Sequence, residues 1–548
     1  MPKLNTLAIG LCLLLVSCGS GGNFKEHSSA SGLLPEQFLP AEASMVLSYS
    51  LMNDDQNELV NALMEKVEDK NRASKTISES FGTSLSQLNL DYDKDLAPAF
   101  GDRFRLVYAT ASAVSTGTGD TSDTYTVITL ADSAKMTSTM DFLVASGKLE
   151  KKTFNDYDAY VSEVDKFYST INQDLFFISS SADGLTEMRE MKSEDSLWAS
   201  DAYQESLEKV GADQVFYVLI YPENINGQVG ALLSSSMAAV LNEEGIVLRA
   251  EEDGLKVEGF ARADEEKAKA ADLKFDNAPK KKAYLLSDFP SESLMFYAES
   301  YGFKQSLTSG NLTDSEGFKN ASRTIQNYLG MNLESEILSF MDKGFVISVN
   351  KNGEAILPGI SILFDVSSDM ENATKFVTKI DAQIAGFMTI LSSALPGAVS
   401  KDKVQINDVD FDSLTVDLSK IPGTGSGSIP SALTSSPIQL SYGIFDDKLL
   451  ITTSSTWDDK KFVSIDDSEL YKEISPKLEK SAEGLLLVNI EEIADFAGTL
   501  VSLREQLGLP VDSDFDLQNA LNGFYALIAS SETKSYEANL EGFLELSK

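Results

Sequence analysis

The side chains best able to do chemistry in this chain are carboxylates at short spacings. Asp91, Asp93 and Asp95 form a D-x-D-x-D run, which is how a calcium-binding loop begins. An EF-hand loop then requires Gly at its sixth position and Glu at its twelfth, where this chain has Leu96 and Asp102. The three aspartates are candidate calcium ligands, and the alternative is a solvated turn that caps the next helix.

A second acidic pattern occurs twice, each time just before a predicted strand. It consists of Asp156 with Asp158, and of Asp408 with Asp410 and Asp412. Paired carboxylates can act as acid and base in glycan hydrolysis, whereas Asn and Asp also form turns through their own backbone. A turn required by the fold would recur and a single active site would not, so the recurrence favours turns.

Serine and lysine occur twice in an S-x-x-K pattern, at Ser206 with Lys209 and at Ser400 with Lys403. The companion motifs K-T-G and S-D-N of serine acyl-enzymes do not occur in the sequence, which favours chance. His27 is the only histidine, and Cys12 and Cys18 are the only cysteines. A Ser-His-Asp triad, a histidine-ligated metal and a catalytic thiol are therefore excluded from the folded body. We expect no enzyme activity and no cofactor.

Cys18 is the residue with the clearest chemistry. An apolar run from Leu7 to Val16 has the length of a signal-peptide core, and Leu15-Val16-Ser17-Cys18 follows the pattern of a bacterial lipobox. We expect residues 1–18 to be a lipoprotein signal peptide with its lipobox and Cys18 to be lipidated by acyl groups such as palmitate. Two or three acyl chains anchor a protein firmly. The polar residues 19–32 then form a flexible tether, and the protein is secreted and lipid-anchored at the outer membrane or cell surface.

The balance of charges restricts the partners. The chain carries 45 basic and 84 acidic residues, for a net charge of −39, which argues against nucleic acid. The expected partners are the membrane, through lipid on Cys18, and an envelope protein or glycan. The acidity itself indicates a solvated surface, or recruitment of divalent cations or a basic partner.

The elements that position these residues occur as an internal repeat, in two copies along the sequence. Asn89-Leu90-Asp91 matches Asn332-Leu333-Glu334, and Glu258-Gly259-Phe260 matches Glu541-Gly542-Phe543. Six further matches occur in the same order along the two copies, one before these two and five between them. We therefore expect a first α+β repeat over 33–263, a linker over 264–283 and a second α+β repeat over 284–548.

Helical periodicity alternates with strand patterns inside each copy. An apolar stripe in 55–68 contains Leu59, Leu63, Met64 and Val67, and one in 368–391 contains Phe376, Val377, Ile380, Ile384, Phe387 and Leu391; both are expected to be core. The sequence predicts an α+β fold made of two tandem copies of a domain, each with a mainly antiparallel sheet and helices packed on one face. Whether the copies share one sheet is left open.

This order of motifs resembles an uncharacterised domain-of-unknown-function family of bacterial lipoproteins and membrane-anchored secreted proteins. The resemblance rests on Leu39–Ser44, on Gly101-Asp102-Arg103 before a strand and on Leu130–Lys135, and it covers most of 33–262 and, more loosely, 284–500. It implies no reaction and no catalytic residues.

The sequence favours a non-enzymatic envelope protein that binds or scaffolds a partner. One alternative is a carboxylate-dependent glycan hydrolase, with the acids at 156–158 or 408–412. Another is an assembly factor for envelope lipids or proteins, which requires a large apolar groove.

Overall fold

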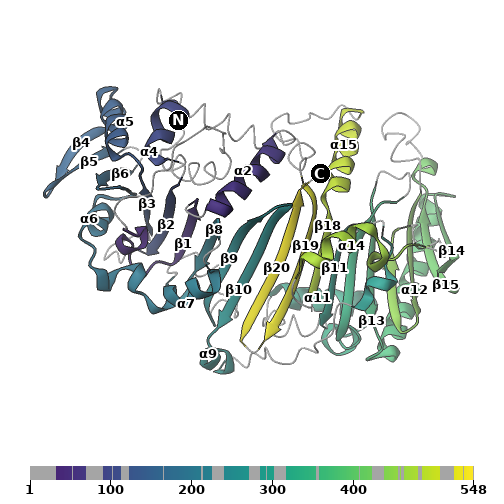
Figure 1. Cartoon of the computed structure of the whole chain (residues 1–548). Coiled ribbons are helices and arrows are strands. Elements are labelled where there is room, and N and C mark those ends of the chain that lie inside the picture. Colours follow the sequence, from purple (N-terminus) through teal and green to yellow (C-terminus); the bar gives the residue numbers. More distant parts are fainter. Residues whose placement is uncertain are drawn as a thin grey trace. The chain divides into compact units, whose positions relative to one another are not determined.

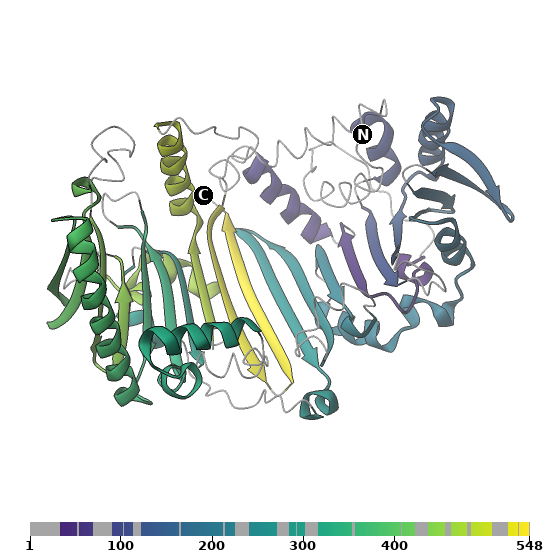
Figure 2. The same ribbon diagram turned by 180° about the vertical axis from the view of Figure 1, so that it is seen from behind.

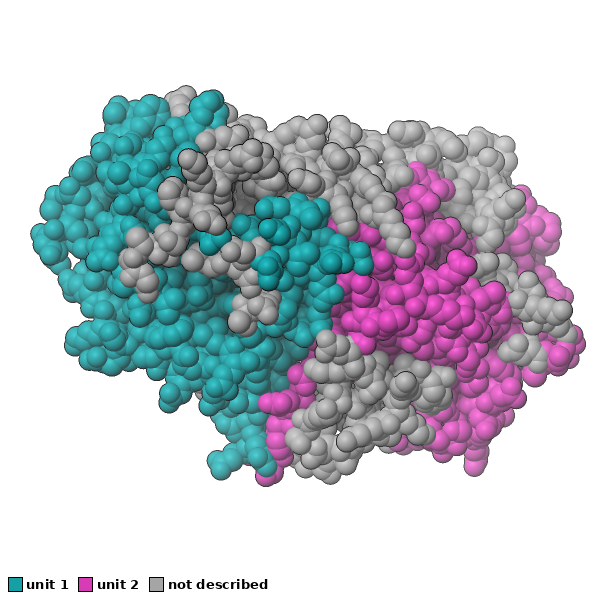
Figure 3. Space-filling model, viewed as in Figure 1, with its two compact units in different colours: residues 1–267 teal, residues 268–548 magenta. Residues whose placement is uncertain are grey.

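The fold is taken from a computed structural model, and the chain divides into two compact units, Met1–Lys267 (unit 1) and Ala268–Lys548 (unit 2), coloured separately in Figure 3. The structure describes residues 33–51, 54–68, 90–101, 103–112, 122–163, 166–211, 214–224, 240–270, 284–291, 293–301, 316–352, 357–406, 408–421, 437–454, 457, 462–478, 484–506, 524–534 and 536–546.

Unit 1 alternates strands with short helices (Figure 1). Its strands are β1 (Met45–Ser50), β2 (Arg105–Ser112), β3 (Ser122–Thr129), β4 (Glu150–Phe154), β5 (Tyr157–Ser162), β6 (Phe167–Asn172), β7 (Leu175–Ser179), β8 (Phe216–Ile220), β9 (Leu241–Glu251) and β10 (Gly254–Ala263). Its helices and helical turns are η1 (Pro35–Phe38), α2 (Asp54–Glu68), η2 (Tyr92–Leu96), α4 (Ala97–Phe100), α5 (Ser133–Ala145), α6 (Ala182–Glu190), η3 (Ser193–Asp195), η4 (Leu197–Ala199), α7 (Asp201–Val210) and η5 (Pro222–Asn224), and α9 (Glu265–Ala270) begins in unit 1 and ends in unit 2. The strands pair antiparallel in the order β10-β9-β8-β1-β2-β3-β7-β6-β5-β4.

Unit 2 repeats this order of pairing. Its strands are β11 (Ser293–Tyr301), β12 (Lys343–Asn350), β13 (Gly359–Asp365), β14 (Val399–Ile406), β15 (Val409–Val416), β16 (Ile438–Phe445), β17 (Lys448–Thr452), β18 (Gly484–Asn489), β19 (Phe524–Lys534) and β20 (Glu537–Leu546). Its helices and helical turns are η6 (Tyr284–Asp288), α11 (Glu316–Leu329), η8 (Leu333–Ile337), α12 (Met370–Ala394), η9 (Leu418–Lys420), η12 (Ile465–Asp467), α14 (Glu469–Ile474), η13 (Ser475–Lys477) and α15 (Ile490–Gln506). The strands pair in the order β20-β19-β18-β11-β12-β13-β17-β16-β15-β14.

The predicted pair of tandem domains is wrong. The strands within the described ranges form one 20-stranded antiparallel sheet, so the two copies are not two domains with a sheet each. The α+β class itself is compatible with this sheet and its helices. What the two units have in common is their order of strand pairing.

The prediction that helices pack on one face is also wrong, because each unit has helices on both faces of its strands. In unit 1, Val107 of β2 and Phe177 of β7 pack in one core with Leu185 of α6 and Tyr203 of α7. The neighbouring Leu106 is also buried, and side chains at successive strand positions point to opposite faces. On that second face Tyr49 of β1, which pairs with Leu106, contacts the ring of Phe104, and Phe104 in turn contacts Phe100 of α4.

Unit 2 is layered in the same way. One core joins Phe296, Val346 and Leu487 to Ile474 of α14, and a second joins Leu449 to Phe340 and to Phe376 of α12. Figure 2 shows α11 and α12 in front of the unit-2 strands, whereas α14 lies in front of them in Figure 1. No helix in the described part of the chain has the length and hydrophobicity needed to cross a bilayer.

The predicted apolar stripes are only partly core. Leu63 of α2 is buried and Leu59 is half-buried, while the side chains of Met64 and Val67 lie outside the described ones. In α12 the stripe is buried at Phe376, but Phe387 is 58% exposed. The prediction that Phe387 is core is wrong, because the helix carries it beyond the part that packs on the strands.

Candidate functional site

The lipidation site predicted at Cys18 lies outside the described residues, as do the tether at 19–32 and His27. The first site that the structure describes is the D-x-D-x-D run at the start of the π-helical turn η2. Asp91 is exposed, its carboxylate pairs with Lys94 at 2.8 Å, and it accepts the Lys94 backbone N–H at 3.2 Å. Asp95 accepts the Asp91 N–H at 2.8 Å and lies 3.9 Å from Lys135.

These contacts are those of a capping turn. The side chain of Asp93 is not among those described. No group of three or more His, Cys, Asp or Glu side chains within the described ranges is placed to hold a metal ion. Calcium binding at Asp91, Asp93 and Asp95 stays a prediction.

The recurring acidic pattern lies on two equivalent hairpins, β4–β5 and β14–β15. The turn residues Asn155 and Asp408 both have positive φ, 50° and 61°. Asp158 pairs with Lys151 at 3.2 Å, and this hydrogen bond lowers the pKa of Asp158 below its usual value. Asp412 pairs with Lys403 at 3.1 Å. Asp158 and Asp412 therefore face lysines of the neighbouring strand, as cross-strand pairs do, while Asp410 accepts the Gln405 side-chain amide at 3.3 Å.

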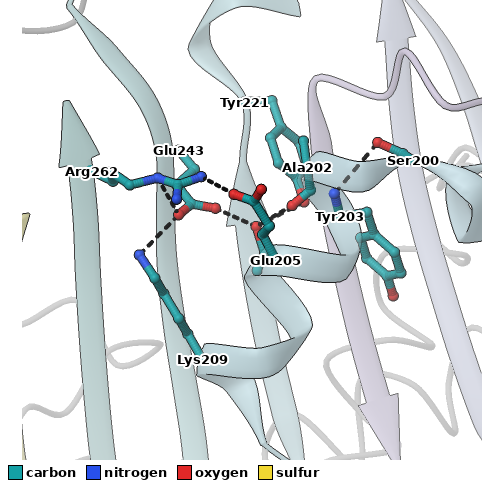
Figure 4. Close-up of polar contacts among 9 residues, drawn as sticks. Ser200, Ala202, Tyr203, Glu205, Lys209, Tyr221, Glu243 and Arg262 are labelled. Carbon is teal, nitrogen blue, oxygen red and sulfur yellow. Dashed lines mark hydrogen bonds and ion pairs between the residues drawn. The ribbon is translucent and has the colours of Figure 1, made fainter. Parts of the chain in front are cut away.

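The S-x-x-K pattern at Ser206 and Lys209 is part of a cluster around the buried carboxylate of Glu243. Figure 4 shows Lys209, Arg262 and Glu205 next to Glu243. Ser206 and Lys209 both lie on α7, which begins after the N-cap Ser200. The Ser206 hydroxyl donates to the carboxylate of Glu243 on β9, and Lys209 Nζ lies 3.0 Å from the same carboxylate. Arg262 Nε lies 3.1 Å from it.

Two further side chains complete the Glu243 cluster. The Tyr221 hydroxyl donates to Ser206 Oγ at 3.2 Å, and burial raises the pKa of Tyr221. Arg262 also pairs with Glu205 of α7 at 2.6 Å. Ser206 is fully buried and Lys209 is held by Glu243, so this arrangement offers neither an accessible nucleophile nor a lysine poised as its base. The second pattern, Ser400 and Lys403, lies on β14, where Lys403 pairs with Asp412.

A second buried carboxylate, Glu36, anchors the same helix. Glu36 accepts hydrogen bonds from Arg105 and from the Tyr203 hydroxyl, the latter at 3.0 Å. Tyr203 and Tyr217 share a hydroxyl contact of 2.5 Å. Burial opposes charge on the Arg105 guanidinium, but Glu36, Tyr217 and Tyr203 together outweigh it and hold the pKa of Arg105 above its usual value. Burial also raises the pKa values of Tyr203 and Tyr217.

Two polar positions of the Glu243 cluster, those of Ser206 and Glu243, are apolar in unit 2. Helix α14 begins after the N-cap Ser468 as α7 begins after Ser200, which makes Ile474 the counterpart of Ser206. Ile220 of β8 pairs with Glu244 of β9, and its counterpart Val488 of β18 pairs with Leu527 of β19. The residues one position earlier, Glu243 and Ala526, are therefore counterparts.

The feature that both units keep is a lysine over an aromatic ring. Lys209 lies 5.0 Å from the ring of Phe260, and Lys477 lies 4.8 Å from that of Phe543. The contact between lysine and aromatic ring is thus common to both units, whereas the contact between Ser206 and Glu243 occurs in unit 1 and not at Ile474 and Ala526.

Sequence reasoning missed Glu36, Arg105, Glu243 and Arg262. The sequence did contain a signal, because charged residues occupy core-facing positions in strands whose residues alternate between the core and the opposite face. Arg105 has the same parity in β2 as the core residues Val107 and Ala109, and Glu243 the same parity in β9 as Val247. An inward charge of this kind requires a buried partner.

A surface pocket of about 530 Å³ lies beside this core in unit 1. Its lining comes from the segment before β1, from the end of α6 and from η3: Pro40, Ala41, Glu42, Glu187, Glu190, Met191, Lys192, Glu194 and Asp195. The Ala41 N–H donates to the Asp195 carbonyl at 3.1 Å, which joins the two sides. Glu187 accepts the Tyr125 hydroxyl at 2.8 Å, and this bond and burial raise the pKa of Tyr125. Five carboxylates against one lysine make the pocket strongly acidic.

These features define a class: an acidic α+β protein with a 20-stranded antiparallel sheet. The family model described as "Protein of unknown function (DUF3352)" matches residues 6–541, and the chain belongs to this family. The predicted resemblance to a domain-of-unknown-function family is thereby confirmed. Neither the comparison with curated proteins nor that with solved structures gives a match.

Proposed function

We propose that this chain is a lipid-anchored protein of the bacterial cell envelope that works by binding a partner, and that the acidic pocket of unit 1 receives a cationic group of that partner. The anchor rests on the sequence Leu15-Val16-Ser17-Cys18, which ends an apolar run of signal-peptide length. Its thiol is the nucleophile that lipidation uses.

The observation that carries the binding role is the pocket itself. Its volume of about 530 Å³ lies within the range of ligand sites, roughly 300–1,000 Å³. Glu42, Glu190 and Glu194 are exposed there, and carboxylates gathered in a concavity focus a negative potential that attracts cations. An arginine or lysine side chain of an envelope protein fits this chemistry, because a carboxylate makes its strongest hydrogen bonds with charged donors.

The contacts of the other candidate catalytic residues favour a binding role over catalysis. The acids at 158 and 412 are paired with lysines, and Ser206 is buried against Glu243. Nothing in these contacts supports the carboxylate-dependent hydrolase.

Crosslinking and capture from envelope membranes test the proposal. Four forms are compared: the wild type, Cys18→Ala, a pocket variant with Glu42, Glu190 and Glu194 changed to Gln, and a control with the exposed Glu58, Glu150 and Glu208 changed to Gln. The control removes the same charge away from the pocket. We expect the wild type and the control to capture the same partner, and the pocket variant to lose it. Equal capture by the pocket variant and the control would contradict the pocket's role, and a Cys18→Ala protein that stays on the membrane would contradict the anchor.

A further inference from the structure

Helix α12 presents bulky apolar side chains to solvent in its second half. Phe387 is 58% exposed and Ile390 is 67% exposed. These residues are three apart and so share one side of the helix. A Cβ added at the neighbouring Gly386 would meet no atom within 4 Å, so this turn of the helix is open as well.

The first half of the helix shows what a packed face looks like in the same element. Ala373 and Phe376 are buried against Phe340 and Leu449. At the middle of the helix, Asp381 pairs with Lys401 of β14 and accepts the Tyr442 hydroxyl at 2.9 Å. Beyond Asp381 the helix loses its charged side chains but keeps its apolar ones.

The charge pattern distinguishes the surfaces that this face fits. Residues 382–400 contain no charged side chain, although 24% of the residues in the chain are charged. A face without charge and with an exposed aromatic residue suits the boundary between lipid headgroups and acyl chains. A second copy of the chain is a poorer occupant, because two chains of net charge −39 repel each other.

We propose that the second half of α12, at Phe387 and Ile390, docks on the surface of the bilayer that holds the anchor. This inference rests on the proposed lipidation of Cys18. The fourteen residues from 19 to 32 extend to at most about 50 Å, which keeps the folded body close to the bilayer. A tether of this length raises the effective concentration of the surface, so a small apolar face is sufficient. Docking fixes one orientation of the acidic body above the lipid.

A single fluorophore on the lipidated protein tests this. Lipidation and cleavage leave no free thiol, so Ile390→Cys provides the only site for an NBD label, and the unlabelled wild type serves as the blank. The matched control is Ile246→Cys on β9, where the side chain is 50% exposed. Both proteins are placed in phosphatidylcholine liposomes, some of which carry nitroxide-labelled acyl chains.

We expect the label at 390 to shift to shorter wavelength and to lose intensity with the nitroxide lipids, and the label at 246 to do neither. Emission typical of water at both positions, in protein that floats with the liposomes, would overturn the docking and leave the anchor intact. Failure to float, or labelling of the wild type, would instead contradict the anchor. A blue shift at 390 without quenching by the lipids would also overturn the proposal, in favour of contact between copies.

Discussion

Replacing Ser206 and Glu243 of unit 1 by the isoleucine and alanine of unit 2 tests how much this buried contact contributes to the free energy of unfolding. The Glu243 side chain is 3% exposed, while Lys209 is 29% and Arg262 is 31% exposed. Removing one partner of a fully buried pair costs about 3–5 kcal/mol. Here both cations keep some water, and Arg262 keeps Glu205. We therefore expect Glu243→Ala to lower the free energy of unfolding by about 2–3 kcal/mol.

The paired replacement should cost less than the sum of its parts. Ser206→Ile alone removes a donor from the buried carboxylate and should cost about 2 kcal/mol or more. Combining it with Glu243→Ala reproduces the Ile474 and Ala526 pair of unit 2 and leaves no buried carboxylate that lacks this donor. Because Lys209 and Arg262 still lose Glu243, we expect the double variant to cost about as much as Glu243→Ala alone.

The assay is urea unfolding of the four proteins of this cycle, followed by far-ultraviolet circular dichroism. The quantity to compare is the cost of the double variant against the sum of the two single costs. A double variant that costs as much as that sum would refute the reasoning, because it would mean that the charges do not act as one unit.

Three further predictions concern pH and packing. Because the pKa values of Tyr203 and Tyr217 are raised in the folded state, their contribution to stability is complete below about pH 10 and is lost as the pH rises toward the folded values; urea midpoints that stay constant well above pH 10 would count against it. Gly359→Ala should cost about 1–3 kcal/mol, since its Cβ would lie 2.6 Å from the Cα of Ser454; an unchanged urea midpoint would be the wrong result. Gly386→Ala, in an open turn of α12, should instead raise thermal stability by about 0.5–1 kcal/mol, and a lower melting temperature would show that the turn is not a regular helix.

The sequence was informative wherever one local rule acts alone. Asp132 follows a strand and precedes a helix, where such a residue commonly acts as the N-cap, and its side chain does accept the Lys135 N–H at 2.8 Å. The turn interpretation of the acids at 156–158 and 408–412 also follows from local backbone chemistry. Hydrophobic periodicity and the matched segments predicted the order of helices and strands in both copies, because the same matches recur along the chain.

The long-range arrangement was beyond these rules. A strand pattern does not say which edges pair, so the single sheet was not predicted from the sequence. The stripe of α12 gave no indication of where its packing ends, and Phe387 was misplaced for that reason. The Glu243 cluster joins α7 to β9 and β10 through residues 206 and 243 or 262, and no local pattern links positions so far apart. A charge at an inward strand position was the only available signal.

The mass of the N-terminal peptide, measured on protein purified from envelope membranes, tests the lipid anchor most directly. We expect this peptide to begin at Cys18 and to carry a diacylglyceryl group, with or without a further acyl group on its amine. A Cys18→Ala protein, processed in parallel, should leave the membrane fraction or keep its first eighteen residues. An unmodified thiol at Cys18 in protein that is nevertheless bound to the membrane would contradict the anchor on which the proposed function rests.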